Sequence, residues 1–176
     1  MKLNCCYVGV LKRCVVGMFV GSLVVLVGCQ STPKPEDTTK LKNMTLQIKD
    51  LSGKPAKLVD GVLKGDHLSI HVVDAATANF NDDGLSDGVV VLALNSGGSG
   101  MFRILCLVYD NGIEKVQVDQ ALLGDRIKIT NLSVDGDRVT VEYLDRAKGQ
   151  PLSEKPTVKK VALYRVQDMK LKKILL

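Results

Sequence analysis

Short segments with alternating polarity constrain the fold of this chain more than any other feature. Apolar Met44, Leu46 and Ile48 alternate with polar neighbours, and residues 67–73 repeat the pattern. A period of two places apolar side chains on one face of a strand, whereas an amphipathic helix needs a period near 3.6. The chain beyond residue 43 is therefore predicted to consist mainly of strands.

Turn residues join several of these segments. The predicted turns lie at Asp60-Gly61 between 56–59 and 62–64, Asn111-Gly112 between 102–109 and 113–118, Asp135-Gly136-Asp137 between 126–134 and 138–144, and Gln167-Asp168 after 158–166. Asn-Gly and Asp-Gly pairs adopt the left-handed conformations that tight hairpins need. These signals predict antiparallel neighbours.

The apolar run Val89 to Leu94 lies between glycine-containing loops and predicts a strand buried on both faces. Helical turns are expected only at 74–78 and 119–123, and a longer loop at 146–157. The fold class is therefore mainly β. We expect a single antiparallel, strand-rich domain over residues 43–176, arranged as a curled sheet, a small sandwich or an open barrel, with few short helical turns.

The N-terminal segment has the layout of an export signal. Lys2, Lys12 and Arg13 precede an apolar stretch from Cys14 to Val27, which is short for a membrane span of about 20 residues. The stretch closes with Leu26-Val27-Gly28-Cys29, which closely resembles the lipobox of bacterial lipoproteins. That resemblance implies a signal peptide over residues 1–28 that is removed, a diacylglyceryl thioether on the Cys29 sulfur and an acylated Cys29 amine. The alternatives are an uncleaved signal anchor or an incidental cysteine.

Residues 29–42 are predicted to be the lipidated cysteine and a flexible tether, because they are polar, contain Pro33 and Pro35, and have no apolar period before Leu41. Two or three acyl chains make release from a bilayer negligible. In lipoproteins of Gram-negative bacteria, a residue such as Gln30 after the cysteine implies sorting to the outer membrane, facing the periplasm. With another envelope type, the expected place is the outer face of the plasma membrane.

The charge balance argues against a nucleic-acid partner. The chain has 24 Lys and Arg against 19 Asp and Glu, but three of the basic residues belong to the signal segment. No basic cluster with interleaved aromatic residues is present, and Trp is absent. The C-terminal lysines Lys170, Lys172 and Lys173 are expected to lie on a solvated strand face.

Once the signal is removed and Cys29 is acylated, Cys106 is the one remaining free thiol, so an intramolecular disulfide is excluded. In the strand 102–109, the period of two places Cys106 on one face with Phe102, Ile104 and Val108. We therefore expect Cys106 to be buried and inert, because a catalytic cysteine needs solvent access and a nearby base.

The segment from Asn79 to Asp87 is the strongest candidate for a metal site. Its spacing of oxygen-bearing residues around Gly84 is similar to that of calcium loops of the EF-hand or integrin-repeat kind. The resemblance implies that the ligands are the side chains of Asn79, Asn81, Asp83 and Asp87 and the carbonyl of Leu85. Asn79 replaces the usual carboxylate, and Val90 stands where an EF-hand has its bidentate glutamate. The alternative is an Asx-rich turn without metal.

Other motifs point less clearly to chemistry. The segment 95–100 lacks the Gly-Lys ending of a phosphate-binding loop and is expected to be a hairpin connection. His67 and His71 would lie about 13 Å apart along a strand, too far to share a metal. Ser96 and Ser99 are the serines in an open loop, but no Gly-x-Ser-x-Gly elbow accompanies them.

Three stretches together resemble a group of exported bacterial proteins of unknown function. They are the Asn79–Asp87 loop with the following apolar run, the segment Gly97-Gly98-Ser99-Gly100-Met101-Phe102, and Leu123-Gly124-Asp125-Arg126. The likeness covers roughly residues 41–145 and implies a shared exported domain, without an established reaction or ligand. Gly124 is expected to supply a turn, and Asp125 with Arg126 a local ion pair or cap. Anion binding by Arg126 is the alternative.

These observations favour an envelope-anchored lipoprotein that is a non-enzymatic binding or structural module, with a membrane contact through its lipid and an envelope protein or glycan as partner. The alternative from another class is an envelope hydrolase or transferase that uses Asp82, Asp83 and Asp87 as carboxylates. A third possibility is an inhibitor or chaperone that presents a sheet edge. Calcium is the one cofactor that the sequence suggests.

Overall fold

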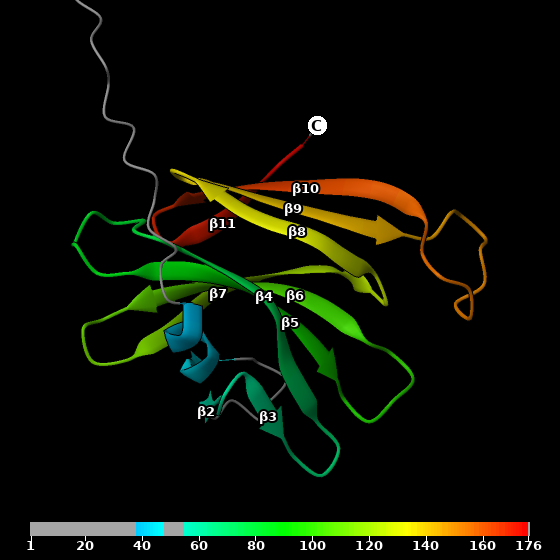
Figure 1. Cartoon of the computed structure of the whole chain (residues 1–176), viewed down its shortest axis with the longest axis horizontal. Helices are drawn as coiled ribbons and strands as arrows, with labels where there is room; N and C mark the ends of the chain where they lie inside the picture. The colour runs from blue at the N-terminus through cyan, green and yellow to red at the C-terminus, as the bar shows by residue number, and fades with distance from the viewer. Residues whose placement is uncertain (1–37, 48–54, 176) are drawn as a thin grey trace, which may run out of the picture. The chain divides into compact units, whose positions relative to one another are not determined.

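The computed structural model describes residues 38–47 and 55–175, all within one compact unit that spans Lys34–Leu176. These ranges form two β-sheets and one short 3-10 helix (Figure 1). The first sheet has the spatial order β2 (Ala56–Lys57), β1 (Thr45–Leu46), β7 (Lys115–Asp125), β6 (Phe102–Asp110), β5 (Asp87–Asn95), β4 (Ser69–Ala78) and β3 (Val62–Lys64). The second sheet has the order β11 (Lys170–Ile174), β10 (Val158–Gln167), β9 (Arg138–Asp145) and β8 (Lys128–Asp135). The predicted mainly β fold is confirmed, and β1 with β7 is a parallel pair among antiparallel ones.

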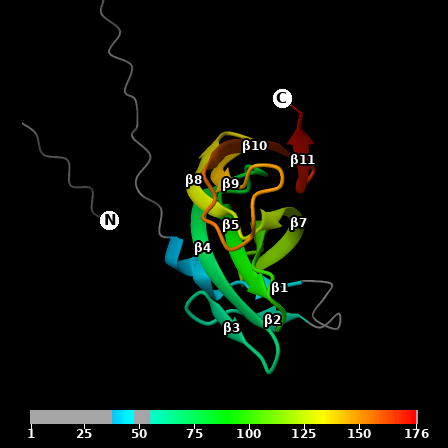
Figure 2. The ribbon, with the colours of Figure 1, turned by 90° about the vertical axis from the view of Figure 1, so that its right-hand side faces the viewer.

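The seven-stranded sheet curls until it is nearly closed (Figure 2). The chain passes from β2 to β3 through Asp60-Gly61, where the backbones of Val59 and Val62 exchange two hydrogen bonds of 3.0 Å. Asp60 and Gly61 have φ of +50° and +81°, as this tight turn requires. The predicted turn is confirmed, although Ala56 and Lys57 pair with β1 instead of β3.

β5 lies between β6 and β4 in the first sheet and is buried on both faces, as predicted. One face packs toward the second sheet, and we call this contact layer the inter-sheet core. It is formed by Val89, Val91, Leu105, Leu107, Leu132, Val139, Val141, Ala162, Tyr164 and Val166. The other face lines the inside of the curl, and we call this layer the concave core. It is formed by Leu41, Met44, Leu46, Leu58, Ile70, Val90, Leu92, Leu94, Ile104, Cys106 and Val108.

The 3-10 helix η1 (Thr38–Asn43) belongs to the folded domain. Leu41 is fully buried in the concave core, and full burial of a leucine side chain contributes about 1.5–3 kcal/mol. Glycine is needed opposite it, because a Cβ on Gly88 would lie 2.6 Å from the backbone oxygen of Ala76 and 2.9 Å from a methyl carbon of Leu41. The prediction of a flexible tether over residues 29–42 is therefore wrong for its last five residues. The first nine lie outside the described residues, as does the predicted signal peptide.

The two predicted helical turns are wrong. Residues 74–78 lie in β4 and pair with β5, and residues 119–123 lie in β7, where they pair with β6. Local helix propensity is a weak preference that strand pairing and burial override. Both strands carry a register shift near these places, between Val72 and Asp74 and opposite Leu107 and Val108. The loop predicted at 146–157 is confirmed between β9 and β10.

Cys106 lies in the concave core with Ile104 and Val108, and Phe102 packs against the same core. The thiol is fully buried and free, and burial raises the pKa of Cys106 far above its usual value. The predicted strand face and the burial of the thiol are both confirmed.

Candidate functional site

The two ends of β5 differ in chemistry. Asp87, its first residue, is fully buried. Its Oδ2 accepts a hydrogen bond from the backbone N–H of Phe80 at 3.1 Å, and its Oδ1 accepts one from Asp110 N–H at 2.9 Å. Burial raises the pKa of Asp87, and the two hydrogen bonds oppose that rise. Because both oxygens hold backbone amides, Asp87 ties the loop before β5 to the end of β6.

Lys115 crosses the same end of the sheet. Its Nζ donates to Oδ2 of Asp110 at 2.8 Å and to the carbonyl oxygen of Ser86, and its side chain is only 7% exposed. The hydrogen bond from Lys115 lowers the pKa of Asp110. We call Asp87, Asp110 and Lys115 the Asp87 cluster, which joins the loop 79–86 to β6 and β7.

The rest of the loop 79–86 consists of turns held by side chains. Asp83 N–H donates to Oδ1 of Asn81 at 3.3 Å, Leu85 N–H donates to Oδ1 of Asp83 at 2.7 Å, and Asn81 Nδ2 donates to Oδ2 of Asp83 at 2.8 Å. Asp82 and Gly84 have φ of +57° and +80°. This is the Asx-rich turn that the sequence offered as the alternative to a metal loop.

Within residues 38–47 and 55–175, no group of three or more His, Cys, Asp or Glu lies where it could hold a metal ion. A cation at the predicted site would compete with the amide donors on Asp83 and with the two backbone amides on Asp87. Calcium binding by Asn79, Asn81, Asp83, Leu85 and Asp87 stays a prediction.

The other candidate catalytic or metal-binding residues differ in their exposure to solvent. Asp82 and Asp83 are exposed whereas Asp87 is buried, so the three carboxylates of the alternative enzyme do not share one setting. His67 and His71 are both exposed, and His71 lies in β4 whereas His67 precedes the strand.

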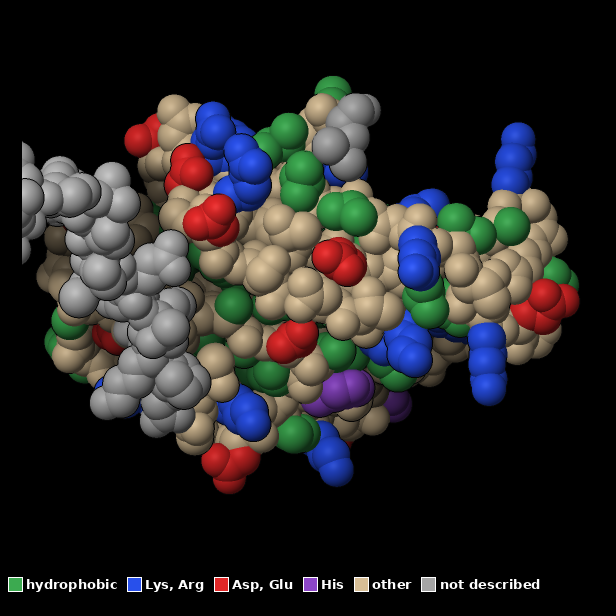
Figure 3. Space-filling view, turned by 45° about the horizontal axis from the view of Figure 1, so that its top comes forward, with side chains coloured by type: hydrophobic (Ala, Val, Ile, Leu, Met, Phe, Trp, Pro, Cys, Tyr) green, Lys and Arg blue, Asp and Glu red, His purple; other side chains and the backbone are tan. Residues whose placement is uncertain are grey.

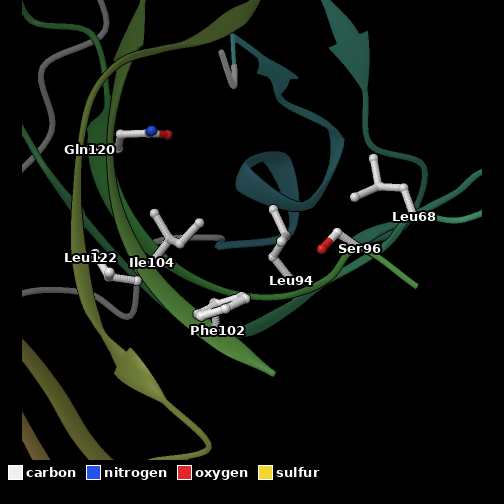
Figure 4. Close-up of a pocket in the computed structure, with 7 residues that line it drawn as sticks. All are labelled: Leu68, Leu94, Ser96, Phe102, Ile104, Gln120 and Leu122. Carbon is white, nitrogen blue, oxygen red and sulfur yellow. The ribbon is translucent and has the colours of Figure 1, made fainter. Parts of the chain in front are cut away.

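The opposite end of β5 opens into a hollow of about 340 Å³ on the concave side of the curled sheet (Figure 4). Five apolar side chains and two neutral polar ones line it: Leu68, Leu94, Phe102, Ile104, Leu122, Ser96 and Gln120. They come from the chain before β4, from β5, from the loop after it, and from β6 and β7. A mainly apolar concavity with a few polar groups is the usual form of a small-molecule site.

One of the two polar lining residues, Gln120, is held by a neighbour on β7. Gln117 Nε2 donates to Oε1 of Gln120 at 2.8 Å, and Gln117 is itself buried. Gln120 and Ser96 both carry their polar atoms toward the hollow in Figure 4. Leu122 is 65% exposed, so an apolar group bound in the hollow could cover part of its side chain.

Residues 95–101, which we call the rim loop, border the hollow. Asn95 organises this loop, because its Nδ2 donates to the carbonyl oxygens of Gly98 and Gly100 and its Oδ1 accepts from Gly97 N–H at 2.8 Å. A Cβ on Gly100 would lie 3.0 Å from the ring of Phe102. Gly100 therefore lies in close contact with the wall of the hollow, where a larger residue would require the Phe102 ring to shift.

Asp125 and Arg126 fasten the rim loop from the end of β7. Asp125 Oδ1 accepts from Met101 N–H at 2.7 Å, and Arg126 N–H donates to the Met101 carbonyl oxygen at 2.8 Å. The Arg126 guanidinium donates to the carbonyl oxygen of Ser99 through Nε at 3.0 Å and through Nη2. The predicted local pair between Asp125 and Arg126 is long, at 4.0 Å.

Two motifs noted in the sequence thus form one unit, since the Leu-Gly-Asp-Arg segment holds the Gly-Gly-Ser-Gly segment. The structure also shows what the sequence did not: Gln120 and Leu122 belong to the hollow. They were hidden because residues 119–123 were expected to be a helical turn. No signal in the sequence could have identified them, because the exposure of Leu122 is known only from the structure.

The outer surface is mixed in charge. Acidic and basic side chains lie among one another on the face in Figure 3. Lys170, Lys172 and Lys173 are exposed on β11, as predicted, and Arg165 on β10 pairs with Asp137 at 3.1 Å. The edge strand β11 is partly covered, because Leu171 N–H donates to Oδ2 of Asp119 at 2.7 Å.

A scan against protein-family models, a search of curated proteins and a search of solved structures found no significant match to this chain. In the part of the chain that the structure describes, no helix is long and apolar enough to cross a membrane.

Proposed function

We propose that this protein is an envelope-anchored lipoprotein whose strand-rich domain is a non-enzymatic binding module, and that its binding site is the hollow beside the rim loop. The observation that carries the proposal is the lining itself: five apolar side chains and two neutral polar ones around about 340 Å³. The hollow is bounded by paired strands and a hydrogen-bonded loop, so it is formed before a ligand arrives. Such a site is suited to binding.

The anchor part of the proposal is supported by the Leu26-Val27-Gly28-Cys29 segment and the apolar stretch before it. The nine residues from Cys29 to Asp37 span at most about 30 Å when fully extended. Lipidation of Cys29 would therefore keep the start of the domain at Thr38 within about 30 Å of a bilayer surface. With Gln30 after the cysteine, we place the protein at the outer membrane, facing the periplasm.

Binding is favoured over catalysis by the distribution of titratable groups. Among the residues that the structure describes, those that line the hollow include no acidic, basic or histidine side chain. The carboxylate with the raised pKa, Asp87, lies at the other end of β5 with both oxygens bonded to backbone amides. A general acid or base needs hydrogen-bond access to a substrate.

Two measurements test the proposal. Mass spectrometry of the mature N-terminus from the native host should show a triacylated or diacylated Cys29, and an unmodified N-terminus would contradict the anchor. Binding is measured with residues 30–176, because both cores lie within that range.

The neutral fluorophore N-phenyl-1-naphthylamine should bind these residues with increased emission. Leu122→Lys should weaken binding at least about tenfold, because it brings a charge into an apolar site. The matched control is Ile113→Lys, an apolar residue that is 94% exposed and lies outside the hollow. Equal binding by both variants would exclude the hollow as the site.

A further inference from the structure

We infer that the hollow selects an uncharged single-chain amphiphile: an aliphatic tail on its apolar wall and a neutral hydrogen-bonding head, such as a glycerol ester, at its polar rim. This inference rests on the proposed function and specifies the ligand. Three features of the lining carry it, namely the aliphatic wall, the position of the neutral polar groups, and the absence of charge.

The wall is mainly aliphatic and continues into the core. Leu68, Leu94, Ile104 and Leu122 contribute branched aliphatic side chains, and Phe102 is the one aromatic ring among the lining residues. Leu94 and Ile104 also belong to the concave core, so the bottom of the hollow is water-poor. An aliphatic chain bound here would lose contact with water, and it would also cover part of the exposed Leu122 side chain.

The head position follows from Ser96 and Gln120. Gln117 already donates to Oε1 of Gln120, which leaves the Nε2 group of Gln120 to donate to a ligand oxygen. The Ser96 hydroxyl both donates and accepts. A hydroxyl or ester head satisfies these two groups without bringing a charge.

A charged head would find no counter-ion among the described residues that line the hollow. The charged residues of the rim, Arg126 and Asp125, are not among the lining residues, and their side chains hold the backbone of Ser99 and Met101. Moving an ionised group out of water without a partner costs far more than moving a hydrogen-bonded neutral group. The hollow should therefore discriminate by charge between amphiphiles with the same tail.

The test is a displacement series with residues 30–176 and N-phenyl-1-naphthylamine as the bound probe. Monolauroylglycerol, laurate and dodecyltrimethylammonium are compared because their tails are of equal length and only their heads differ in charge. All three are used below their micelle concentrations. We expect monolauroylglycerol to displace the probe at concentrations at least about tenfold lower than either ion. Equal or stronger displacement by an ion would overturn the inference while leaving the site itself intact. Failure of the probe to bind would instead overturn the proposed function.

The variant Gln120→Leu tests the head position. Gln120 is exposed, so the change should not unfold the domain, and it keeps an aliphatic side chain for the tail. We expect the preference for monolauroylglycerol over laurate to fall at least about threefold, because one donor to the neutral head is lost. Gln150→Leu, in the loop between β9 and β10, serves as the control and should keep the preference. An unchanged preference in Gln120→Leu would overturn the assigned head position.

Discussion

The two ends of β5 show how one strand can close a fold at one end and leave it open at the other. At Asp87, a buried carboxylate accepts hydrogen bonds from two backbone amides. Lys115 links loop 79–86 to β6, because it donates to the carbonyl oxygen of Ser86 and to the Asp110 carboxylate. At Asn95, the strand runs into a glycine-containing loop beside a hollow. At the Asp87 end, which we call the sealed end, polar side chains therefore close the fold with buried hydrogen bonds. At the Asn95 end, which we call the open end, they hold only the rim loop in place.

The two ends of β5 also differ in whether their buried polar side chains have hydrogen-bond partners. Asp87 is satisfied twice, but Arg103 on β6 has Nε and Nη1 buried with no hydrogen-bond partner in the described residues. Arg103 lies near the open end, opposite Ala93 and Gly124. Burial lowers the pKa of Arg103, and the charge of Asp125 opposes that effect. A buried polar group thus stabilises a fold only where its partners are in place.

The largest effect is expected from Asp87→Asn, which leaves one acceptor for two backbone amides and places an amide group against an N–H donor. The free energy of unfolding should fall by about 2–3 kcal/mol, measured by urea denaturation. Asp82→Asn, at an exposed position of the same loop, should change it by less than about 0.5 kcal/mol. Similar losses in both variants would break the contrast between a sealed end and an open end.

Arg103→Met should act in the opposite direction. Replacing an unpartnered buried guanidinium by an apolar side chain of similar length should raise the free energy of unfolding by about 1–2 kcal/mol. Arg138→Met, at an exposed site on β9, is the control and should have little effect. Destabilisation by Arg103→Met would show that the guanidinium is satisfied in solution.

Arg126→Lys should loosen the rim, because lysine cannot make the two guanidinium contacts with Ser99. We expect a loss of about 0.5–1 kcal/mol and faster amide exchange in residues 96–101. Arg165→Lys, which alters an exposed ion pair with Asp137, provides a matched comparison and should leave that exchange unchanged. Unchanged protection of the rim in Arg126→Lys would contradict its role as a fastener.

The pH dependence should have opposite signs for the two carboxylates of the Asp87 cluster. The folded pKa of Asp87 is raised above 3.8, so the folded state binds more protons and wild-type stability falls as pH rises through that window. The deficit of Asp87→Asn relative to wild type should therefore shrink as pH rises above 3.8. The pKa of Asp110 is lowered, so the deficit of Asp110→Asn should shrink as pH falls below 3.8. Urea denaturation between pH 3 and 7 measures both, and equal signs would contradict the assignment.

Calcium should have the smallest effect. A weak site half-filled at millimolar calcium would add about 0.4 kcal/mol to the free energy of unfolding, seen as a small rise in Tm. Asp83→Asn should abolish that rise. A Tm that does not respond to calcium would show that the loop 79–86 is purely a turn.

Much of the fold was predictable because strand signals are local. The tight turn at Asp60-Gly61, the doubly buried run 89–94 and the strand face that holds Cys106 all depend on neighbours in sequence. The helical turns at 74–78 and 119–123 were wrong, because pairing with β5 and β6 outweighs the preference of five residues. The candidate loop was located by its motif, but the partners of Asp87 lie on β6 and upstream in the loop, beyond what spacing alone reveals.

By itself, the sequence determined that this chain forms a strand-rich domain with an inert buried cysteine, because alternation and turn propensity act within a few residues. Only the tertiary structure decided that Leu41 belongs to the core, that Arg126 fastens the rim loop, and that Leu122 faces a hollow. The reason is physical: the curl of the sheet brings together side chains that are far apart in sequence, and burial depends on that closure.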